Sequence, residues 1–183
     1  MNSPQRCKWV KAQSIAYHDK EWGKPNYDDN YLFEILMLEG FQAGLSWECV
    51  LNKREAFRCA FDNFDYKKIA AYTPEKQATL LSNSNIIRHR LKIKAASNNA
   101  EIFMKIQSEY GSFANYIWHF TEGKQIINRD SIIRSTSLLS DTISKDLQKR
   151  KMKFVGSTII YSYLQAIGIV DDHEPTCAFA KKN

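Results

Sequence analysis

Helical periodicity runs through almost all of this 183-residue chain and leaves little room for a sheet. Apolar positions spaced i, i+3, i+4 and i+7 mark one face of a helix. Here they are Leu32, Ile35 and Leu36, followed by Glu39. No run of alternating polar and apolar residues is long enough to build a sheet, and residues 126–127 allow only a short strand. We therefore predict an all-α fold.

Capping residues divide this periodicity into separate helices. In "TPEK", Thr73 can cap a helix that has Pro74 at its first position. A long helix is expected from about Arg88 through Ile106, and the last helix should stop at Gly168. Further N-caps are expected at side chains that accept a backbone N–H, namely Asp28 or Asp29, Ser46, Ser112 and Ser140. Length and the lack of repeats predict a single domain over residues 1–183, made of two closely packed helical lobes.

Composition and charge narrow the class of protein. The chain has no uncharged apolar run of membrane-spanning length and no apolar signal core at its start. We therefore expect a monomer in the cytoplasm that makes no membrane contact. The net charge of +6 favours polyanionic partners. Much of it lies in residues 88–94 and 145–153, which are either solvated helix faces or contacts for phosphate groups.

Cysteine and histidine residues recur at both ends of the chain. Cys7 and His18 stand near the start, whereas His173 and Cys177 stand near the end. Two thiolates and two imidazoles suit tetrahedral zinc, and four protein ligands would close the metal shell and make the ion structural. Scattered cysteines can equally be buried thiols, and spacing alone leaves both explanations open. Four cysteines without a secretion signal argue against a disulfide framework.

The stretch "LMLEGFQAGLSW" at residues 36–47 aims a carboxylate inward. Glu39 continues the apolar face of its helix and is followed by Gly40, Gly44 and Trp47. A buried carboxylate is costly unless it is paired. The simplest explanation is an acid at a helix end that meets a hydrogen-bond donor.

Three motifs carry a resemblance over nearly the whole chain. They are "AYHDKEWG" at residues 16–23, "LEGFQAGLSWECVLNKRE" at 38–55 and "KFVGSTIIYSYLQAIGIVDDH" at 153–173. With these motifs in this order, the chain resembles the DNA-3-methyladenine glycosylase I family of bacterial alkylation-repair enzymes. The resemblance implies an all-α helix-hairpin-helix DNA glycosylase fold, with the N- and C-terminal segments clipped together by one structural zinc ion. It places that ion on Cys7, His18, His173 and Cys177, and it makes Cys49 and Cys59 core thiols.

The implied activity is that of a monofunctional hydrolase. Such an enzyme flips 3-methyladenine out of double-stranded DNA, releases it as the free base and leaves an abasic site. The resemblance assigns catalysis to Glu39 and base binding to Tyr17, Trp47 and Trp9. In DNA this base carries a positive charge, so Glu39 would accept from its exocyclic amine and pair with its charge. Tyr17 and Trp47 would stack on it, at about 0.5–2 kcal/mol each. Because the base leaves neutral, no strong general acid is required.

DNA contacts are expected from two places. Leu45 is either a wedge that fills the gap in the duplex or a core residue at a helix start. The turn from Asn85 to Arg88 would present backbone N–H groups to a phosphate, with charge added by Arg88, Arg90 and Lys92. Lys92 is assigned to the DNA backbone, although related bifunctional glycosylases use a lysine amine to form a Schiff base.

Two positions depart from the family pattern. Asn85 stands where members usually have Gly at the hairpin, and Lys151 in "KRKMKFVG" replaces the Gly of the commoner "KRGFKFVG". Asn is the residue other than Gly that best tolerates a positive φ, so the hairpin is expected to survive. A helical protein that senses alkylated bases without cutting remains the competing interpretation, because it too would need Glu39. An enzyme acting on free nucleotides is disfavoured by the lack of a phosphate loop or catalytic metal motif.

Overall fold

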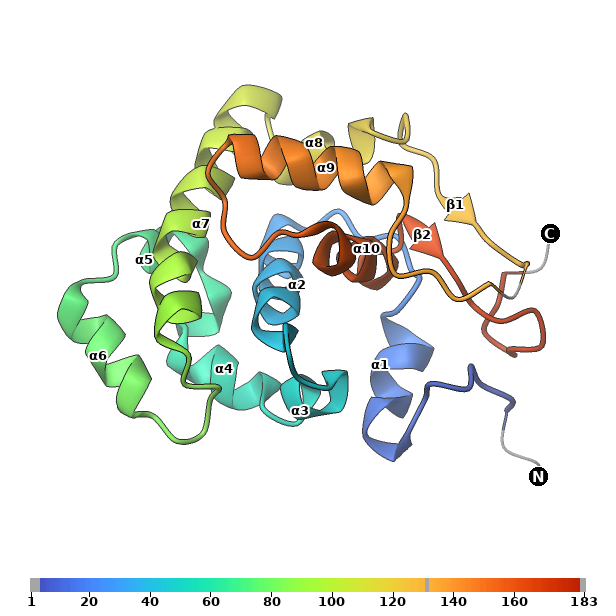
Figure 1. The fold of residues 1–183 in the computed structure, drawn as a ribbon, viewed down its shortest axis with the longest axis horizontal. Helices are drawn as coiled ribbons and strands as arrows, with labels where there is room; N and C mark the ends of the chain where they lie inside the picture. Colours follow the sequence, from blue (N-terminus) through green and yellow to red (C-terminus); the bar gives the residue numbers. More distant parts are fainter. Residues whose placement is uncertain (1–3, 131, 182–183) are drawn as a thin grey trace.

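The computed structural model describes residues 4–130 and 132–181, and it is mostly helical, as predicted (Figure 1). The helices are α1 (Ile15–Lys20), α2 (Asp29–Gln42), α3 (Trp47–Leu51), α4 (Arg54–Ala60), α5 (Tyr66–Ala70), α6 (Pro74–Ser82), α7 (Arg90–Tyr110), α8 (Phe113–His119), α9 (Leu138–Lys149) and α10 (Ser157–Ala166). Short 3-10 turns lie at Ala12–Ser14 and Asp62–Phe64. The short strand β1 (Ile126–Ile127) pairs in parallel with β2 (Val170–Asp171). Within the described residues, no helix is long and apolar enough to cross a membrane.

Most of the predicted caps are found, and one is displaced. N-cap side chains accept a backbone N–H at Asp28, Ser46, Thr73 and Ser112. The cap of α9 is Ser137 and not Ser140, so the prediction for that helix was wrong by three residues. Ser140 occupies the third helical position, where its hydroxyl accepts from the Ser137 N–H and completes a capping box. Both serines satisfy the same local rule, and only the fold shows which of them starts the helix.

Helix α2 runs through the centre of the molecule and packs against α10, α7 and α8 (Figure 1). Its side chains from Leu32 through Phe41 are all buried, including two carboxylates, Glu34 and Glu39. On one side of α2, α7 carries α5 and α6; on the other lie α10, α1 and the ends of the chain. The C-terminal end of α2 therefore lies between these two groups of helices.

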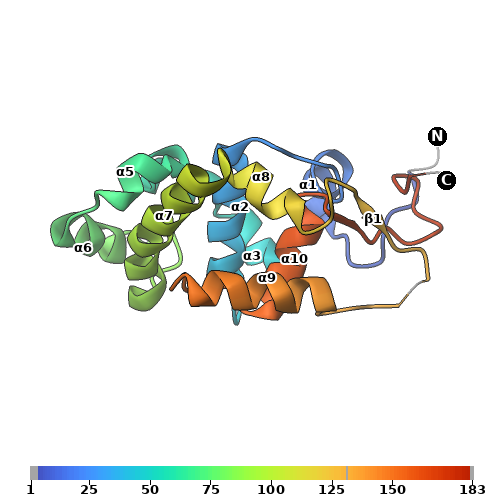
Figure 2. The same ribbon diagram turned by 90° about the horizontal axis from the view of Figure 1, so that it is seen from above.

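Segments from near the two ends of the chain, residues 5–8 and 174–178, lie side by side (Figure 2). The Ala178 amide donates to the Gln5 carbonyl at 2.8 Å, and the Lys8 amide donates to the Glu174 carboxylate at 2.7 Å. The fold thereby brings Cys7 close to Cys177, although nearly the whole sequence separates them.

The two departures from the family pattern differ in backbone conformation: Lys151 is left-handed and Asn85 is not. Lys151 has φ +73° and follows α9 in a Schellman turn, in which the Met152 amide donates to the Leu147 carbonyl at 3.0 Å. Glycine is the residue that suits this position, and lysine is strained there. Asn85 does not adopt a positive φ, so the tolerance of asparagine for left-handed backbone is not needed at this position. Gly168 has φ +76°, and a Cβ there would lie 2.1 Å from the carbonyl carbon of Lys24.

Candidate active site and candidate metal centre

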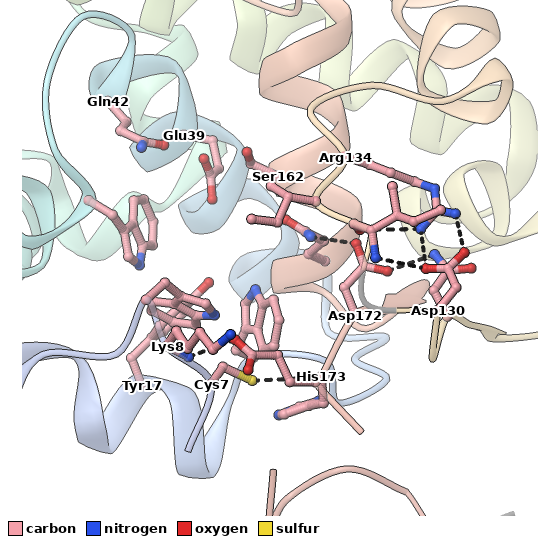
Figure 3. A pocket seen from close by; sticks show the side chains of 18 residues that line it. Cys7, Lys8, Tyr17, Glu39, Gln42, Asp130, Arg134, Ser162, Asp172 and His173 are labelled. Carbon is pink, nitrogen blue, oxygen red and sulfur yellow. Dashed lines mark hydrogen bonds and ion pairs between the residues drawn. The ribbon is translucent and has the colours of Figure 1, made fainter. Parts of the chain in front are cut away.

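A cavity of about 420 Å³ opens where the end of α2 meets the two terminal segments (Figure 3). Its lining includes all four residues that the sequence assigned to the pocket, Glu39, Tyr17, Trp47 and Trp9. They come from α2, α1, α3 and the N-terminal segment, so the tertiary fold brings together residues that are far apart in the sequence. This gathering is a result of the structure and does not by itself test the role of each residue.

Glu39 points from α2 into this cavity (Figure 3). The residue is 3% exposed, and its Oε2 has no hydrogen-bond partner within the part of the chain that is described. Burial raises the pKa of Glu39 to about 8, because no positive group offsets the loss of water. The site therefore disfavours the ionised carboxylate unless a positively charged group lies beside it. The expected helix-end donor for Glu39 is not found among the described residues.

Aromatic rings form a bent wall beside Glu39. The ring centroids of Tyr17 and Trp47 lie 5.3 Å apart, with their planes tilted by 57°. Trp9 packs edge-on against Trp22, with centroids 5.1 Å apart. Rings so close and so tilted leave no slot for a flat ligand between Tyr17 and Trp47. A ligand in this cavity would lie against the faces or edges that the wall exposes.

Unpartnered polar atoms gather in the same cavity. Within the described residues, the buried indole N–H groups of Trp9 and Trp47 lack an acceptor. Buried polar groups are normally hydrogen-bonded, so orphaned ones call for an explanation. Two indole N–H groups and one carboxyl oxygen of residues that line the cavity are thus without partners among the described residues.

The sequence analysis did not assign every residue that lines the cavity. Trp22 is part of the buried core and also borders the cavity. Asp172 lines the opposite wall, where its carboxylate accepts from Tyr161 at 2.6 Å, Gln165 at 2.7 Å and Asn128 at 2.6 Å. The signal for Asp172 was its place in "VDDH", next to a candidate metal ligand, but no local pattern indicates that it faces Glu39 across a cavity.

Three of the four candidate metal ligands come together at the joined ends of the chain. One ligand atom from each of Cys7, His18 and Cys177 lies within 4.8 Å of the others, and all three residues are buried. His173 stands just outside this group, with its ring centroid 5.0 Å from that of His18. Its Nε2 is buried and has no partner among the described residues. A ring nitrogen without a partner, beside two thiols and a second imidazole, fits a site for a tetrahedral cation.

Carboxylates orient both histidines in the same way. His18 Nδ1 lies 2.7 Å from Asp19, and His173 Nδ1 lies 2.7 Å from Asp171. Each carboxylate is also held by an arginine, Arg6 for Asp19 and Arg129 for Asp171. This arrangement is typical of metal-binding histidines, because the acid fixes the ring and leaves Nε2 free for the metal.

The cysteines differ in their surroundings. Burial raises the pKa of the Cys7 thiol to about 12. Cys49 is half-buried and Cys59 is exposed, so Cys59 is not the core thiol that was expected.

The residues expected to contact DNA fall into two groups. Leu45 is 43% exposed, which rules out the alternative that it is a core residue. Asn85 and Arg88 are exposed in the segment between α6 and α7, and Arg90 is exposed at the start of α7. Lys92 is different, because it is 5% exposed and its ammonium donates to main-chain carbonyls. The expected contact between Lys92 and a phosphate is therefore wrong, since its charge is enclosed by protein.

Comparison with known proteins identifies close relatives. The family model described as methyladenine glycosylase matches residues 7–181. The DNA-3-methyladenine glycosylase of Haemophilus influenzae is 45% identical over 177 residues, covering 94% of this chain and 96% of that protein. DNA-3-methyladenine glycosylase 1 of Escherichia coli is 43% identical over 178 residues, covering 94% of this chain and 95% of that protein.

Solved structures agree with these relatives. A crystal structure of a 3-methyladenine DNA glycosylase I has a TM-score of 0.93 at 45% identity and covers 97% of this chain and 100% of that chain. A structure that describes 3-methyladenine recognition by the Staphylococcus aureus enzyme has a TM-score of 0.90 at 35% identity, covering 94% of both chains.

Proposed function

The chain belongs to the methyladenine glycosylase family, and on that premise we propose that it is a monofunctional hydrolase that excises 3-methyladenine from alkylated double-stranded DNA. Its products are the free base and an abasic site, which begins base excision repair. A related glycosylase has been solved in complex with 3-methyladenine, which supports the same ligand here. We expect the chain to act as a monomer.

The unpaired acid in the cavity is the observation that carries this proposal. Glu39 is buried with no positively charged partner among the described residues, and burial raises its pKa to about 8, so the site disfavours a lone negative charge. A base that carries a positive charge supplies the missing partner and draws Glu39 into its ionised form. Neutral adenine supplies no such partner. The site therefore discriminates by charge between the alkylated base and the normal one.

The aromatic wall adds affinity and orientation. Tyr17 or Trp47 offers a ring face to the cationic base, at about 0.5–2 kcal/mol for each stacked ring. The tilt between them supports stacking on one ring with an edge contact to the other. The free N–H groups of Trp9 and Trp47 are placed to donate to acceptor nitrogens on the base.

The chemistry makes small demands on the protein. Alkylation at N3 weakens the bond between the purine and C1′, because the base departs as a neutral molecule. Water adds to C1′ as the bond to the base breaks, and the proton of that water passes to solvent. Glu39 in its ionised form would stabilise the positive charge that develops on the sugar, as carboxylates do in glycoside hydrolysis.

Access to the base requires it to leave the duplex. We infer that α6, the turn at residues 83–89 and α7 form the helix-hairpin-helix element that holds the DNA backbone. Asn85, Arg88 and Arg90 are exposed there and would contact phosphates. Leu45 is exposed in the turn after α2 and would fill the space that the flipped nucleotide vacates.

We propose that one zinc ion binds Cys7, His18, His173 and Cys177. Support comes from the clustered thiols and the unpartnered Nε2 of His173. With four protein ligands the ion is structural: it holds the two ends of the chain together and activates no water. Metal analysis should find one zinc per chain, and Cys177→Ser should lose it together with resistance of the chain ends to proteolysis. A zinc-free protein with protected ends would overturn this assignment.

The proposed activity is tested by incubating the protein with DNA treated with a methylating agent and measuring released bases by chromatography. Release of 3-methyladenine, with unmodified adenine retained in the DNA, is the expected result. Tight binding to methylated DNA without release would instead identify a protein that senses the damage.

A further inference from the structure

Lys92 makes a contact that the proposed reaction has not yet used. It lies in the first turn of α7, and its ammonium donates to the Phe41 carbonyl at 2.9 Å and to the Ala43 carbonyl at 2.7 Å. The ring centroid of Phe154 lies 5.9 Å from the same nitrogen. Both carbonyls belong to the C-terminal end of α2, where carbonyls lack partners within the helix and carry partial negative charge. A lysine from one helix thus caps the end of another.

The segment that Lys92 caps carries the residues proposed to act on DNA. Glu39 lies in the last turn of α2, and residues 43–46 form the turn that presents Leu45. Gly44 adopts φ +85°, and a Cβ at that position would have no neighbour within 4 Å, so the turn projects into open space. Among the described residues, Lys92 provides the side-chain hydrogen bonds to the main chain of residues 41–45.

At its other end Lys92 belongs to the hairpin. His89 caps α7 by accepting from the Lys92 amide at 3.4 Å, and the exposed Arg88 and Arg90 lie beside it. A single residue therefore joins the element proposed to hold the phosphate backbone to the turn proposed to enter the duplex.

We propose that Lys92 is a positioning residue for base flipping, which holds the turn at residues 43–46 in register with the hairpin. This inference rests on the proposed glycosylase activity. A shift of about 1 Å in a group that must meet its target is costly to a reaction, and a turn without side-chain anchors is free to make it. Lys92 does not border the cavity, so it is not placed to attack C1′ as a Schiff-base lysine.

The test compares Lys92→Met with Lys92→Arg and with Lys67→Met, in which an exposed lysine of α5, outside the proposed DNA-binding element, loses the same charge. Single-turnover excision from a methylated duplex should fall about 10- to 100-fold in Lys92→Met. Arginine should restore most of it, and Lys67→Met should remain within about threefold of wild type. Affinity for free 3-methyladenine, followed by tryptophan fluorescence, should stay within about twofold in all variants, because the base pocket itself is unchanged.

A second measurement asks whether Lys92 acts through Leu45. Leu45→Ala alone should slow excision, but the same substitution should add little to the loss already caused by Lys92→Met. The effects of two residues that act as one unit on the excision rate are not additive. If Lys92→Met does not fold, Lys92→Gln takes its place with the same expected pattern.

Three outcomes would overturn the proposal: unchanged duplex excision, an equal loss of free-base affinity, or additive effects with Leu45→Ala. Failure of wild-type protein to release any base would instead overturn the proposed function. Base release by wild-type protein therefore distinguishes failure of this proposal from failure of the proposed function.

Discussion

Helix α2 buries two glutamates five residues apart, and their surroundings are opposite. Glu34 is 8% exposed and accepts from Arg54 at 2.6 Å and from Arg58 at 2.9 Å. Glu39 is 3% exposed, with no ion pair among the described residues, and its pKa is raised to about 8. The same side chain on the same helix is neutralised at one position and left without a partner at the other.

This contrast separates a structural acid from a functional one. Glu34 ties α4 to the central helix through two arginines, and Arg54 extends the network to Glu21 at 2.8 Å. The whole set is satisfied without any ligand. Glu39 has an aromatic cavity where its partner should be, and we propose that the alkylated base supplies the charge. An unpaired buried acid is therefore the stronger indication of function.

The largest expected effect tests Glu39 directly. Glu39→Gln keeps the shape of the side chain and removes its charge, so excision of 3-methyladenine should fall by about 100-fold or more, equivalent to roughly 2.7 kcal/mol of lost stabilisation. Single-turnover kinetics measures the rate, while circular dichroism and metal analysis should show an unchanged fold and zinc content. Wild-type rates in this variant would remove Glu39 from the mechanism.

The matched substitution at Glu34 should change stability instead. Glu34→Gln leaves Arg58 and part of Arg54 without their buried counter-charge, which typically costs about 3–5 kcal/mol of unfolding free energy. Urea denaturation measures this loss, and excision by the folded fraction should stay near wild type. If Glu34→Gln has the unfolding free energy of wild type but no longer excises the base, the distinction between the two acids is wrong.

Dependence on pH should distinguish the acids again. Glu39 has a folded-state pKa of about 8, above its ordinary value of 4.5. Between these values the folded protein holds a proton that the unfolded chain releases. This stabilising contribution is complete below about pH 4.5 and is lost as the pH rises toward 8. Relative to Glu39→Gln, wild-type protein should therefore lose roughly 4 kcal/mol between pH 5 and pH 9, because about three pKa units separate pH 5 from the folded-state value and one unit corresponds to about 1.4 kcal/mol.

Urea denaturation of both proteins at the two pH values provides this measurement. A constant difference in unfolding free energy would show that Glu39 already has a counter-charge in solution.

The smallest expected effect, a gain in stability away from the cavity, serves as a reference for the other variants. Lys151→Gly relieves the left-handed backbone after α9 and should raise the unfolding free energy by about 0.5–1 kcal/mol. Excision should not change, because the turn lies away from the cavity. If activity instead rises with stability, the losses at Glu34 and Glu39 must be corrected for the same dependence before they are compared.

Local chemistry explains how much of the fold was predictable. Caps at Asp28, Ser46 and Thr73 were placed correctly because a side-chain oxygen and a following apolar stripe are both local signals. The N-cap predicted at Ser140 was wrong because Ser137, three residues earlier, can accept the same kind of backbone hydrogen bond. The organisation as a single domain stays a prediction.

Individual sites show the same limit. Lys92 was assigned to phosphate because it follows two exposed arginines, and nothing in its own neighbourhood reveals that its side chain turns inward to α2. Asp172 was overlooked for the corresponding reason, since its position opposite Glu39 depends on how α10 and the loop after β1 meet. A contact between two segments that are far apart in the sequence produces no periodic pattern in either segment.

The sequence by itself determined the helical class, most helix starts, the family and four of the residues that line the cavity, because these follow from short-range periodicity and from motifs within single segments. Only the tertiary structure decided which buried acid is neutralised, which lysine is enclosed, and that Tyr17 and Trp47 meet at an angle. Each of these depends on the charges and surfaces that other helices bring to the same place. A carboxylate becomes a structural or a functional group according to what lies within a few ångströms of it.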